Sequence, residues 1–190
     1  MKKHTPPLLG FAAASGTGKT TLLTKLIPLL KKSGLRIGVI KHSHHNFEID
    51  KPGKDSYQLR KAGASPIMLI SNKRRAMITE FDDISIPRLK DQLKFFDYTE
   101  LDLILVEGFK AEEFPKIELH RSSLKETLIF PKDPNIIAIA SDAEIKITTH
   151  NSKLSNEQIL LLKTPPVLDL NNPIVIADFV LNHFFKNKNN

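Results

Sequence analysis

Eight residues near the amino terminus, Ala-Ala-Ser-Gly-Thr-Gly-Lys-Thr from Ala13 to Thr20, have the spacing of a loop that binds phosphate. Glycines allow the backbone to curl so that its N–H groups point inward at phosphate oxygens. In such a loop Lys19 reaches the β- and γ-phosphates, and the Thr20 hydroxyl binds Mg²⁺. Ala13 replaces the first glycine of the motif, which matters little if Ala13 belongs to the preceding strand. The sequence therefore predicts a site for a triphosphate or a similar anion.

The segments on either side of the loop predict the strand and the helix that such a loop requires. An apolar run from Leu8 to Ala14 predicts a strand that enters it. The segment from Thr20 to Lys32 predicts a helix that leaves it, and the amino terminus of that helix adds a partial positive charge to the phosphate site. The apolar residues of this helix share one broad face: Leu22, Leu23, Leu26, Ile27 and Leu30.

A carboxylate follows a second apolar run. The residues from Leu101 to Val106 predict a buried central strand, and Glu107 comes directly after it. Open α/β sheets bind ligands at the carboxyl ends of their strands. Four apolar residues and then an acid form the Walker B pattern, whose acid holds the Mg²⁺ shell or orients a water. We therefore predict Lys19 and Glu107 as the catalytic pair, with Thr20 and Glu107 as metal ligands.

The remaining pattern alternates strands and helices, which is typical of a mainly parallel sheet covered on both faces. We predict an α/β fold of the P-loop NTPase type, with a peripheral β-hairpin and a single domain over residues 1–190. A right-handed return would place the strand 36–41 beside the strand 8–14. The other expected elements are helices at 56–61, 87–97 and 173–186, hairpin strands at 66–71 and 76–80, and a strand at 136–140.

Three histidines follow the strand 36–41 at the same sheet edge, in the run Lys41-His42-Ser43-His44-His45. They could bind a transition metal, contact a ligand or partner, or belong to a solvated loop. Residues 50–56 contain turn residues, and Asp55 or Ser56 is expected to cap the next helix. Asp142 follows the strand 136–140; it either accepts hydrogen bonds from a guanine base or belongs to a plain turn.

Composition limits the class of protein. The chain has 190 residues and 41% hydrophobic content, enough for one α/β domain with a sizeable core. It has no cysteine, which excludes disulfides and thiolate zinc sites. Neither a membrane-spanning segment nor a signal peptide is visible, so we expect a soluble cytoplasmic protein. The net charge of +7 favours anionic partners.

Six strings of the sequence share a pattern with one known family. They are F-A-A-A-S-G-T-G-K-T-T-L-L from Phe11, I-K-H-S-H-H from Ile40, D-K-P-G-K-D-S-Y-Q-L-R-K-A-G-A from Asp50, L-D-L-I-L-V-E-G-F-K from Leu101, P-K-I-E from Pro115 and I-A-S-D from Ile139. With these strings the chain resembles the MobB family. The resemblance implies a P-loop protein that binds GTP with Mg²⁺, hydrolyses it slowly and acts as an adaptor in molybdenum cofactor biosynthesis. It also implies a homodimer that works beside MobA, the guanylyltransferase that joins GMP to molybdopterin.

The resemblance also implies roles for individual residues. Lys41, His42, Asp50 and Lys54 would line a groove beside the loop, where molybdopterin, its guanine dinucleotide or the partner could sit. Two alternatives stay open: a P-loop small-molecule kinase, and a basic nucleic-acid-binding protein, although the charge is accompanied by no RNA-binding or helix-turn-helix signature. The loop residues that would hold phosphate and Mg²⁺ are Ser15, Gly16, Thr17, Gly18, Lys19, Thr20 and Thr21.

Overall fold

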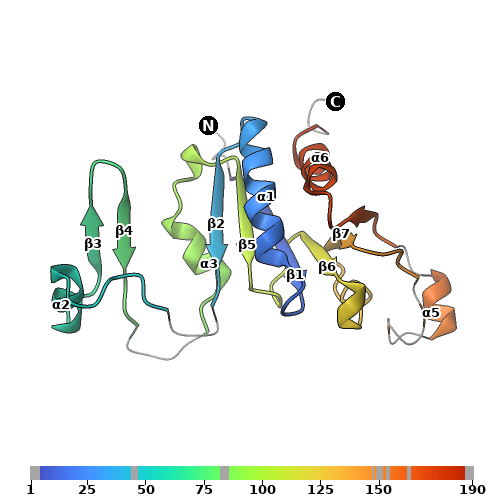
Figure 1. The fold of residues 1–190 in the computed structure, drawn as a ribbon, viewed down its shortest axis with the longest axis horizontal. Coiled ribbons are helices and arrows are strands. Elements are labelled where there is room, and N and C mark those ends of the chain that lie inside the picture. The colour runs from blue at the N-terminus through green and yellow to red at the C-terminus, as the bar shows by residue number, and fades with distance from the viewer. Residues whose placement is uncertain are drawn as a thin grey trace. The chain divides into compact units, whose positions relative to one another are not determined.

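The computed structural model describes residues 5–43, 47–81, 86–146, 148, 152, 155–161 and 164–186. The chain forms two compact units (Figure 1). Unit 1 consists of Met1–His42 and Leu89–Asn190, and unit 2 is Ser43–Arg88. The elements predicted around the phosphate loop belong to unit 1, and a single domain over residues 1–190 stays a prediction.

A six-stranded sheet forms the centre of unit 1, with the strand order β2-β5-β1-β6-β7-β8. Every pair of neighbouring strands in it is parallel, so the predicted mainly parallel sheet is confirmed. All carboxyl ends of these strands therefore meet at one edge. The strands are β1 Leu8–Ala13, β2 Ile37–Lys41, β5 Leu103–Glu107, β6 Lys116–His120, β7 Ile136–Ser141 and β8 Val167–Asp169.

The prediction that the strand 36–41 lies beside the strand 8–14 was wrong. Strand β5 lies between β1 and β2, and it pairs with both. Its residues Leu103 to Val106 are fully buried, whereas Val39 of β2 is 44% exposed. The uniformly apolar strand takes an interior place because both of its faces are covered there, and β2 takes the edge of the sheet. Glu107 consequently ends a strand that directly adjoins the strand of the phosphate loop.

Sequence reasoning did not predict strands β6 and β8. Strand β8 is only three residues long, and β6 carries polar residues at buried positions. The buried Lys116 donates from Nζ to Asp133 Oδ2 at 3.0 Å, and the buried Glu118 accepts the N–H groups of Ile129 and Phe130. These hydrogen bonds satisfy the buried polar groups. The two polar residues, however, interrupt the apolar run by which a buried strand is predicted from sequence.

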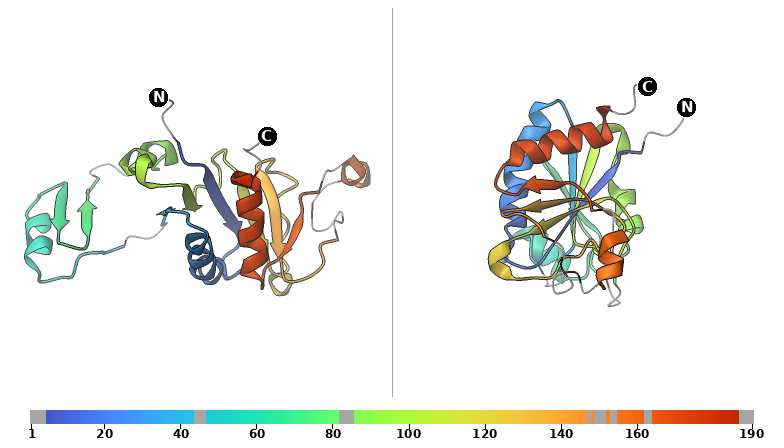
Figure 2. Two further views of the ribbon diagram at one scale, coloured as in Figure 1. Left: turned by 90° about the horizontal axis from the view of Figure 1, so that it is seen from above. Right: turned by 90° about the vertical axis from the view of Figure 1, so that its right-hand side faces the viewer.

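Helices cover both faces of the sheet, as expected (Figure 2). Helices α1 (Lys19–Lys32) and α6 (Pro173–Phe184) pack over the face formed by Leu9, Phe11 and Leu105. Leu22, Leu23, Leu26 and Leu30 form the buried stripe of α1.

On the opposite face, Ile104 and Val106 pack against Leu89 and Phe114. Leu89 begins α3 (Leu89–Gln92), which continues as short 3₁₀ turns at Leu93–Phe95 and Tyr98–Glu100. The predicted helix over 87–97 is therefore shorter than expected. The remaining short elements of unit 1 are the 3₁₀ turn η3 (Ser122–Leu124) and helix α5 (Asn156–Leu161).

Unit 2 contains helix α2 (Asp55–Lys61) and the antiparallel strands β3 (Ile67–Ile70) and β4 (Arg75–Ile78), so the predicted hairpin is confirmed. The predicted helix cap was wrong, because Lys54 occupies the cap position and no side chain caps the helix. The Ser56 hydroxyl donates to Asp50 Oδ1 at 2.9 Å instead.

Candidate functional site

The phosphate loop lies between β1 and α1. Gly16 and Gly18 have φ values of 79° and 95°, a left-handed conformation that glycine adopts without strain. Gly18 is the cap residue of α1, and no side chain caps this helix. The first N–H groups of an α-helix have no partner within the helix. A loop and a helix start of this kind offer backbone donors to an anion, and that an anion binds here stays a prediction.

Glu107 faces two lysine side chains at the carboxyl edge of the sheet. Its Oε1 atom lies 3.7 Å from Lys19 Nζ and 3.3 Å from Lys41 Nζ. The Glu107 side chain is 14% exposed and that of Lys19 is 19% exposed, so this pair is partly shielded from water. The structure thus brings together three predicted site residues from β2, β5 and the start of α1. A carboxylate held beside the loop lysine is well placed to bind the cation of a metal–phosphate complex.

The ends of β2 and β5 are locked together next to this carboxylate. The N–H of His42 donates to the Glu107 carbonyl at 2.8 Å, and the His42 ring stacks on Phe109 with centroids 4.9 Å apart. Gly108 has a φ of 95°, and a Cβ atom there would lie 2.7 Å from His42 Cβ. Only glycine suits this close approach. His42 is therefore placed beside Glu107 by the backbone, while its ring packs on Phe109.

Two basic residues that sequence reasoning missed contact the loop. Lys110 Nζ donates to the Ala13 carbonyl at 2.8 Å, and Arg121 Nε donates to the Thr17 carbonyl at 3.1 Å. Lys110 lies shortly after β5, in one of the strings that resemble the family. Arg121 follows β6 directly, so recognising β6 as a strand would have placed Arg121 at the ligand-binding edge.

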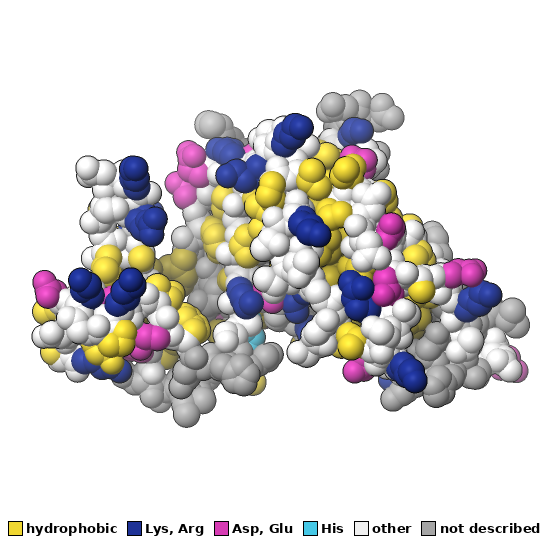
Figure 3. All heavy atoms as spheres, in the orientation of Figure 1, with side chains coloured by type: hydrophobic (Ala, Val, Ile, Leu, Met, Phe, Trp, Pro, Cys, Tyr) yellow, Lys and Arg dark blue, Asp and Glu magenta, His cyan; other side chains and the backbone are white. Residues whose placement is uncertain are grey.

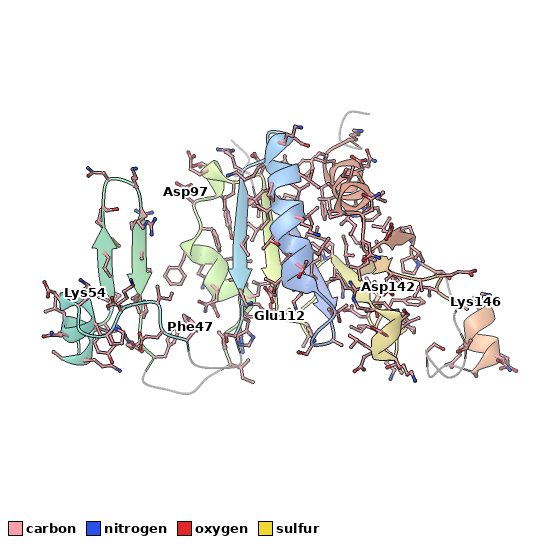
Figure 4. The ribbon with its side chains drawn as sticks, viewed as in Figure 1. Phe47, Lys54, Asp97, Glu112, Asp142 and Lys146 are labelled. Atoms are coloured by element: carbon pink, nitrogen blue, oxygen red, sulfur yellow. The ribbon has the colours of Figure 1, made fainter. Side chains whose placement is uncertain are left out.

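Asp142, labelled in Figure 4, follows β7 and contacts the two residues that come directly after β6. Its Oδ1 accepts the Ser122 N–H at 2.8 Å, and its Oδ2 lies 3.2 Å from Arg121 NH1. The hydrogen bond from Ser122, with help from the Arg121 charge, holds the pKa of the Asp142 carboxyl below its ordinary value. The carboxylate is therefore ionised at neutral pH. Its role in guanine recognition stays a prediction.

A cavity of about 250 Å³ lies next to the loop and is lined in part by Ala13, Ala14 and Thr17. Lys110 and Arg121 also line it, together with polar groups from β6 and the segment after it. Burial raises the pKa of the Glu118 carboxyl, which lines this cavity and is only 1% exposed. The loop is thus bordered by a hollow on the side where Lys110 and Arg121 hold its carbonyls.

The remaining predicted residues are not part of this cluster in unit 1. Asp50 and Lys54 belong to unit 2, where Lys54 precedes α2 and Asp50 accepts the Ser56 hydroxyl. Their place beside a nucleotide stays a prediction. His44 and His45 lie outside the described residues. Among the residues that are described, no group of three His, Asp or Glu side chains has the geometry of a metal site.

The residues present suit a Mg²⁺–triphosphate complex. Thr20 is exposed in the first turn of α1, and Glu107 supplies an anionic oxygen at the same edge. Mg²⁺ usually binds one or two protein oxygens and takes its other ligands from phosphates and water. A site with Thr20 and Glu107 therefore does not require a larger cluster of protein ligands.

A parallel sheet with this loop between its central strand and a helix defines the chain as a P-loop protein of the α/β class. Residues 8–142 match the family model described as "Molybdopterin guanine dinucleotide synthesis protein B". The chain belongs to this family, MobB.

Relatives of known description support this membership. The molybdopterin-guanine dinucleotide biosynthesis adapter protein of Escherichia coli (strain K12) is 46% identical over 178 residues, which cover 92% of this chain and 91% of that one. The protein of the same description from Haemophilus influenzae is 42% identical over 183 residues, with 94% and 91% covered.

Solved structures share the fold. The crystal structure of Bacillus subtilis MobB has a TM-score of 0.67 at 23% identity and covers 94% of this chain and 98% of its own. A crystal structure of molybdopterin-guanine biosynthesis protein B has a TM-score of 0.65 at 21% identity, with 93% and 99% covered. Within the described part of the chain, every helix is too short or too polar to span a membrane.

Proposed function

We propose that this chain binds GTP with Mg²⁺ at its phosphate loop, hydrolyses it slowly, and acts as an adaptor in the biosynthesis of molybdopterin guanine dinucleotide. The observation that carries the nucleotide part is the pairing of Glu107 with Lys19 at the mouth of the loop, with Oε1 and Nζ 3.7 Å apart. Membership of the MobB family supports the adaptor part, because the relatives that match along most of the chain carry that description.

The residues of the loop divide the work of binding. The N–H groups from Ser15 to Thr21 donate to the phosphate oxygens, and the Lys19 ammonium neutralises the β- and γ-phosphates. The Thr20 hydroxyl and the Glu107 carboxylate hold Mg²⁺, which withdraws charge from the phosphates when it is bound. Glu107 is already paired with Lys19 and Lys41. Because its carboxylate is engaged by these two ammonium groups and by Mg²⁺, Glu107 is a poor general base, and this supports slow hydrolysis.

Titration with GTP, GDP and ATP, each with and without Mg²⁺, tests this proposal. GTP should bind more tightly than ATP. The substitution Lys19→Ala should weaken binding by about 100-fold, because a hydrogen bond to a charged group contributes up to about 3 kcal/mol. Lys25→Ala, an exposed lysine of the same helix, is the matched control and should leave binding unchanged. Equal affinity for GTP and ATP would contradict the proposed preference for guanine. Unchanged binding by Lys19→Ala would contradict the proposal that the nucleotide binds at the phosphate loop.

A homodimer is part of the proposal, and the surface of unit 2 supports it. Met68 and Met77 are directly paired across the hairpin and are 51% and 44% exposed, and Ile70 on the same face is 74% exposed. Hydrophobic side chains are visible on this unit among Lys and Arg side chains (Figure 3). A two-stranded hairpin is marginally stable by itself. A second copy would cover this face with the same residues about a two-fold axis.

The adaptor role predicts contact with the guanylyltransferase that attaches GMP to molybdopterin. Size-exclusion chromatography of the two purified proteins, with GTP and Mg²⁺ present, should show that they elute together. The Lys19→Ala chain should elute separately if nucleotide controls the contact. Separate elution of the wild-type proteins in every nucleotide state would contradict the direct-contact part of the proposal.

A further inference from the structure

Three carbonyl groups of the phosphate loop are held by side-chain donors. Lys110 Nζ donates to the Ala13 carbonyl at 2.8 Å, and the Thr17 hydroxyl donates to the Ala14 carbonyl at 2.8 Å. Arg121 Nε donates to the Thr17 carbonyl at 3.1 Å. In a trans peptide unit the C=O and the N–H point in opposite directions. A donor that fixes the Thr17 carbonyl therefore directs the Gly18 N–H to the opposite side, where phosphate is bound.

We propose that Arg121 is a positioning residue of the phosphate loop, and that Asp142 acts on nucleotide binding through Arg121 instead of reading the base. This inference rests on the proposed nucleotide site. It gives the pair a role that is independent of which base is bound.

The geometry of Asp142 supports this role. One carboxylate oxygen accepts the Ser122 N–H at 2.8 Å, and the other lies 3.2 Å from Arg121 NH1. Reading guanine through its N1–H and 2-amino group would require the two oxygens to face the base together. Here both oxygens face residues 121 and 122, at the end of the neighbouring strand. The carboxylate fixes the guanidinium, and the guanidinium fixes the loop.

The surroundings of Arg121 also agree with a positioning role. Its NH2 atom would lie 3.6 Å from a Cβ atom placed on Gly18, so the guanidinium lies close against the loop backbone. Thr17, whose carbonyl it holds, is 1% exposed. The side chain of Arg121 is 31% exposed and that of Asp142 is 16% exposed, so water screens their attraction only in part. A charge-assisted hydrogen bond in such a place orients its acceptor strongly.

Nucleotide affinity tests the inference on the full chain. The dissociation constants of GTP, xanthosine triphosphate and ATP are measured with Mg²⁺ for the wild type, Arg121→Ala, Asp142→Asn and the double variant. Arg121→Ala should weaken binding of all three nucleotides by about tenfold, with their ratios unchanged. Asp142→Asn should weaken all three in the same proportion. The double variant should be no weaker than Arg121→Ala, because the two residues act in one chain of contacts.

Two further variants separate positioning from a general loss of structure. Arg36→Ala removes a similar ion pair, in which Nε lies 3.0 Å from Asp102 Oδ2, at the amino ends of β2 and β5. It should leave nucleotide affinity unchanged. Arg121→Lys keeps a donor for the Thr17 carbonyl and should recover part of the lost affinity. The thermal midpoints of all variants without nucleotide show whether any affinity loss reflects unfolding.

A readout without nucleotide distinguishes failure of this inference from failure of the proposed function. The amide NMR signal of Gly18 in the free protein should shift in Arg121→Ala and in Asp142→Asn, and should stay in place in Arg36→Ala. If the wild type binds no nucleotide, the proposed function fails, while the Gly18 signal still decides whether Arg121 holds the loop. Unchanged nucleotide affinity and an unchanged Gly18 signal in Arg121→Ala would overturn the inference.

A change of base preference would overturn the role given to Asp142. Xanthine carries an oxygen where guanine carries its 2-amino group, so an amide side chain that reads the base would favour xanthine. A shift of about tenfold or more from GTP towards xanthosine triphosphate in Asp142→Asn would therefore show that Asp142 reads the base.

Discussion

Unit 1 and unit 2 differ in what they bury. The buried hydrophobic residues of the described structure all belong to unit 1, where they cover both faces of the parallel sheet. In the described part of unit 2 the only buried residue is Arg60, whose guanidinium donates to Glu48 and Glu80. Unit 2 also carries many of the exposed large hydrophobic residues: Phe47, Ile49, Leu59, Met68, Ile70, Met77, Phe81 and Ile86.

This difference bears on the two proposed functions, nucleotide binding and association. Unit 1 holds the phosphate loop and Glu107 on a sheet that is stabilised by its own apolar core. Unit 2 is held together by the hairpin β3–β4 and by the ion pairs of Arg60 with Glu48 and Glu80. It also leaves apolar surface exposed. Exposed apolar patches commonly mark interaction surfaces. The proposed nucleotide site is therefore expected in unit 1, and the proposed association surface in unit 2.

The largest expected effect is on stability, at a buried position of unit 1 and an exposed position of unit 2. Leu105→Ala, at a fully buried position of β5, should lower the free energy of unfolding by about 2–5 kcal/mol, because it leaves a cavity. Leu59→Ala, the same substitution at a 58% exposed position of α2, should change it by less than about 0.5 kcal/mol. Urea unfolding measures both values. Equal losses would break the distinction between the two units.

A buried carboxylate shows whether the stability of unit 1 also depends on polar groups. Glu118 accepts the Ile129 N–H at 2.7 Å with Oε1 and the Phe130 N–H at 2.8 Å with Oε2. Glu118→Gln replaces one acceptor with a donor, so one buried N–H loses its partner. Urea unfolding at neutral pH should show a loss of about 1–3 kcal/mol. Glu126→Gln, in the segment that follows β6, provides an exposed control; an equal loss there would contradict this account.

The association assigned to unit 2 should be sensitive to charge on its hairpin. Met68→Glu combined with Met77→Glu places two like charges directly opposite each other on the exposed face. Sedimentation should show that the proposed dimer of this double variant dissociates about tenfold or more readily, a change of about 1.4 kcal/mol. Val175→Glu, at a 39% exposed position of α6 in unit 1, is the control and should leave association unchanged. Matching effects of the two changes would remove the reason to assign association to unit 2.

The smallest expected effect concerns the site edge of unit 1. The pKa of Asp142 is lowered in the folded chain, so the folded state binds fewer protons than the unfolded state between the lowered and the ordinary value. The stability that Asp142 contributes is present above the ordinary Asp pKa and is lost as pH falls through the lowered value. Asp142→Asn should remove this part of the acid dependence in thermal unfolding. An unchanged acid dependence would mean that the Asp142 carboxylate does not contribute to the stability of the fold.

Much of the site could be predicted because its chemistry lies in contiguous residues. The glycines, Lys19 and Thr20 of the loop are neighbours in the chain, and the stripe of α1 follows helical periodicity. Glu107 was predictable because an uninterrupted apolar strand precedes it. Strand β6 was not, since Lys116 and Glu118 occupy buried positions where sequence patterns expect apolar residues.

The sequence by itself determined the phosphate loop, the carboxylate after β5, the parallel α/β class and the hairpin, because each follows from local spacing or from periodic apolar residues. Only the tertiary structure decided that β5 separates β1 from β2 and that Arg121 and Lys110 hold the loop. Arg121 is 104 residues from Thr17 in the chain, and Lys110 is 97 residues from Ala13. Contacts at such separations depend on which strands become neighbours in the sheet, and that depends on burial of the whole core.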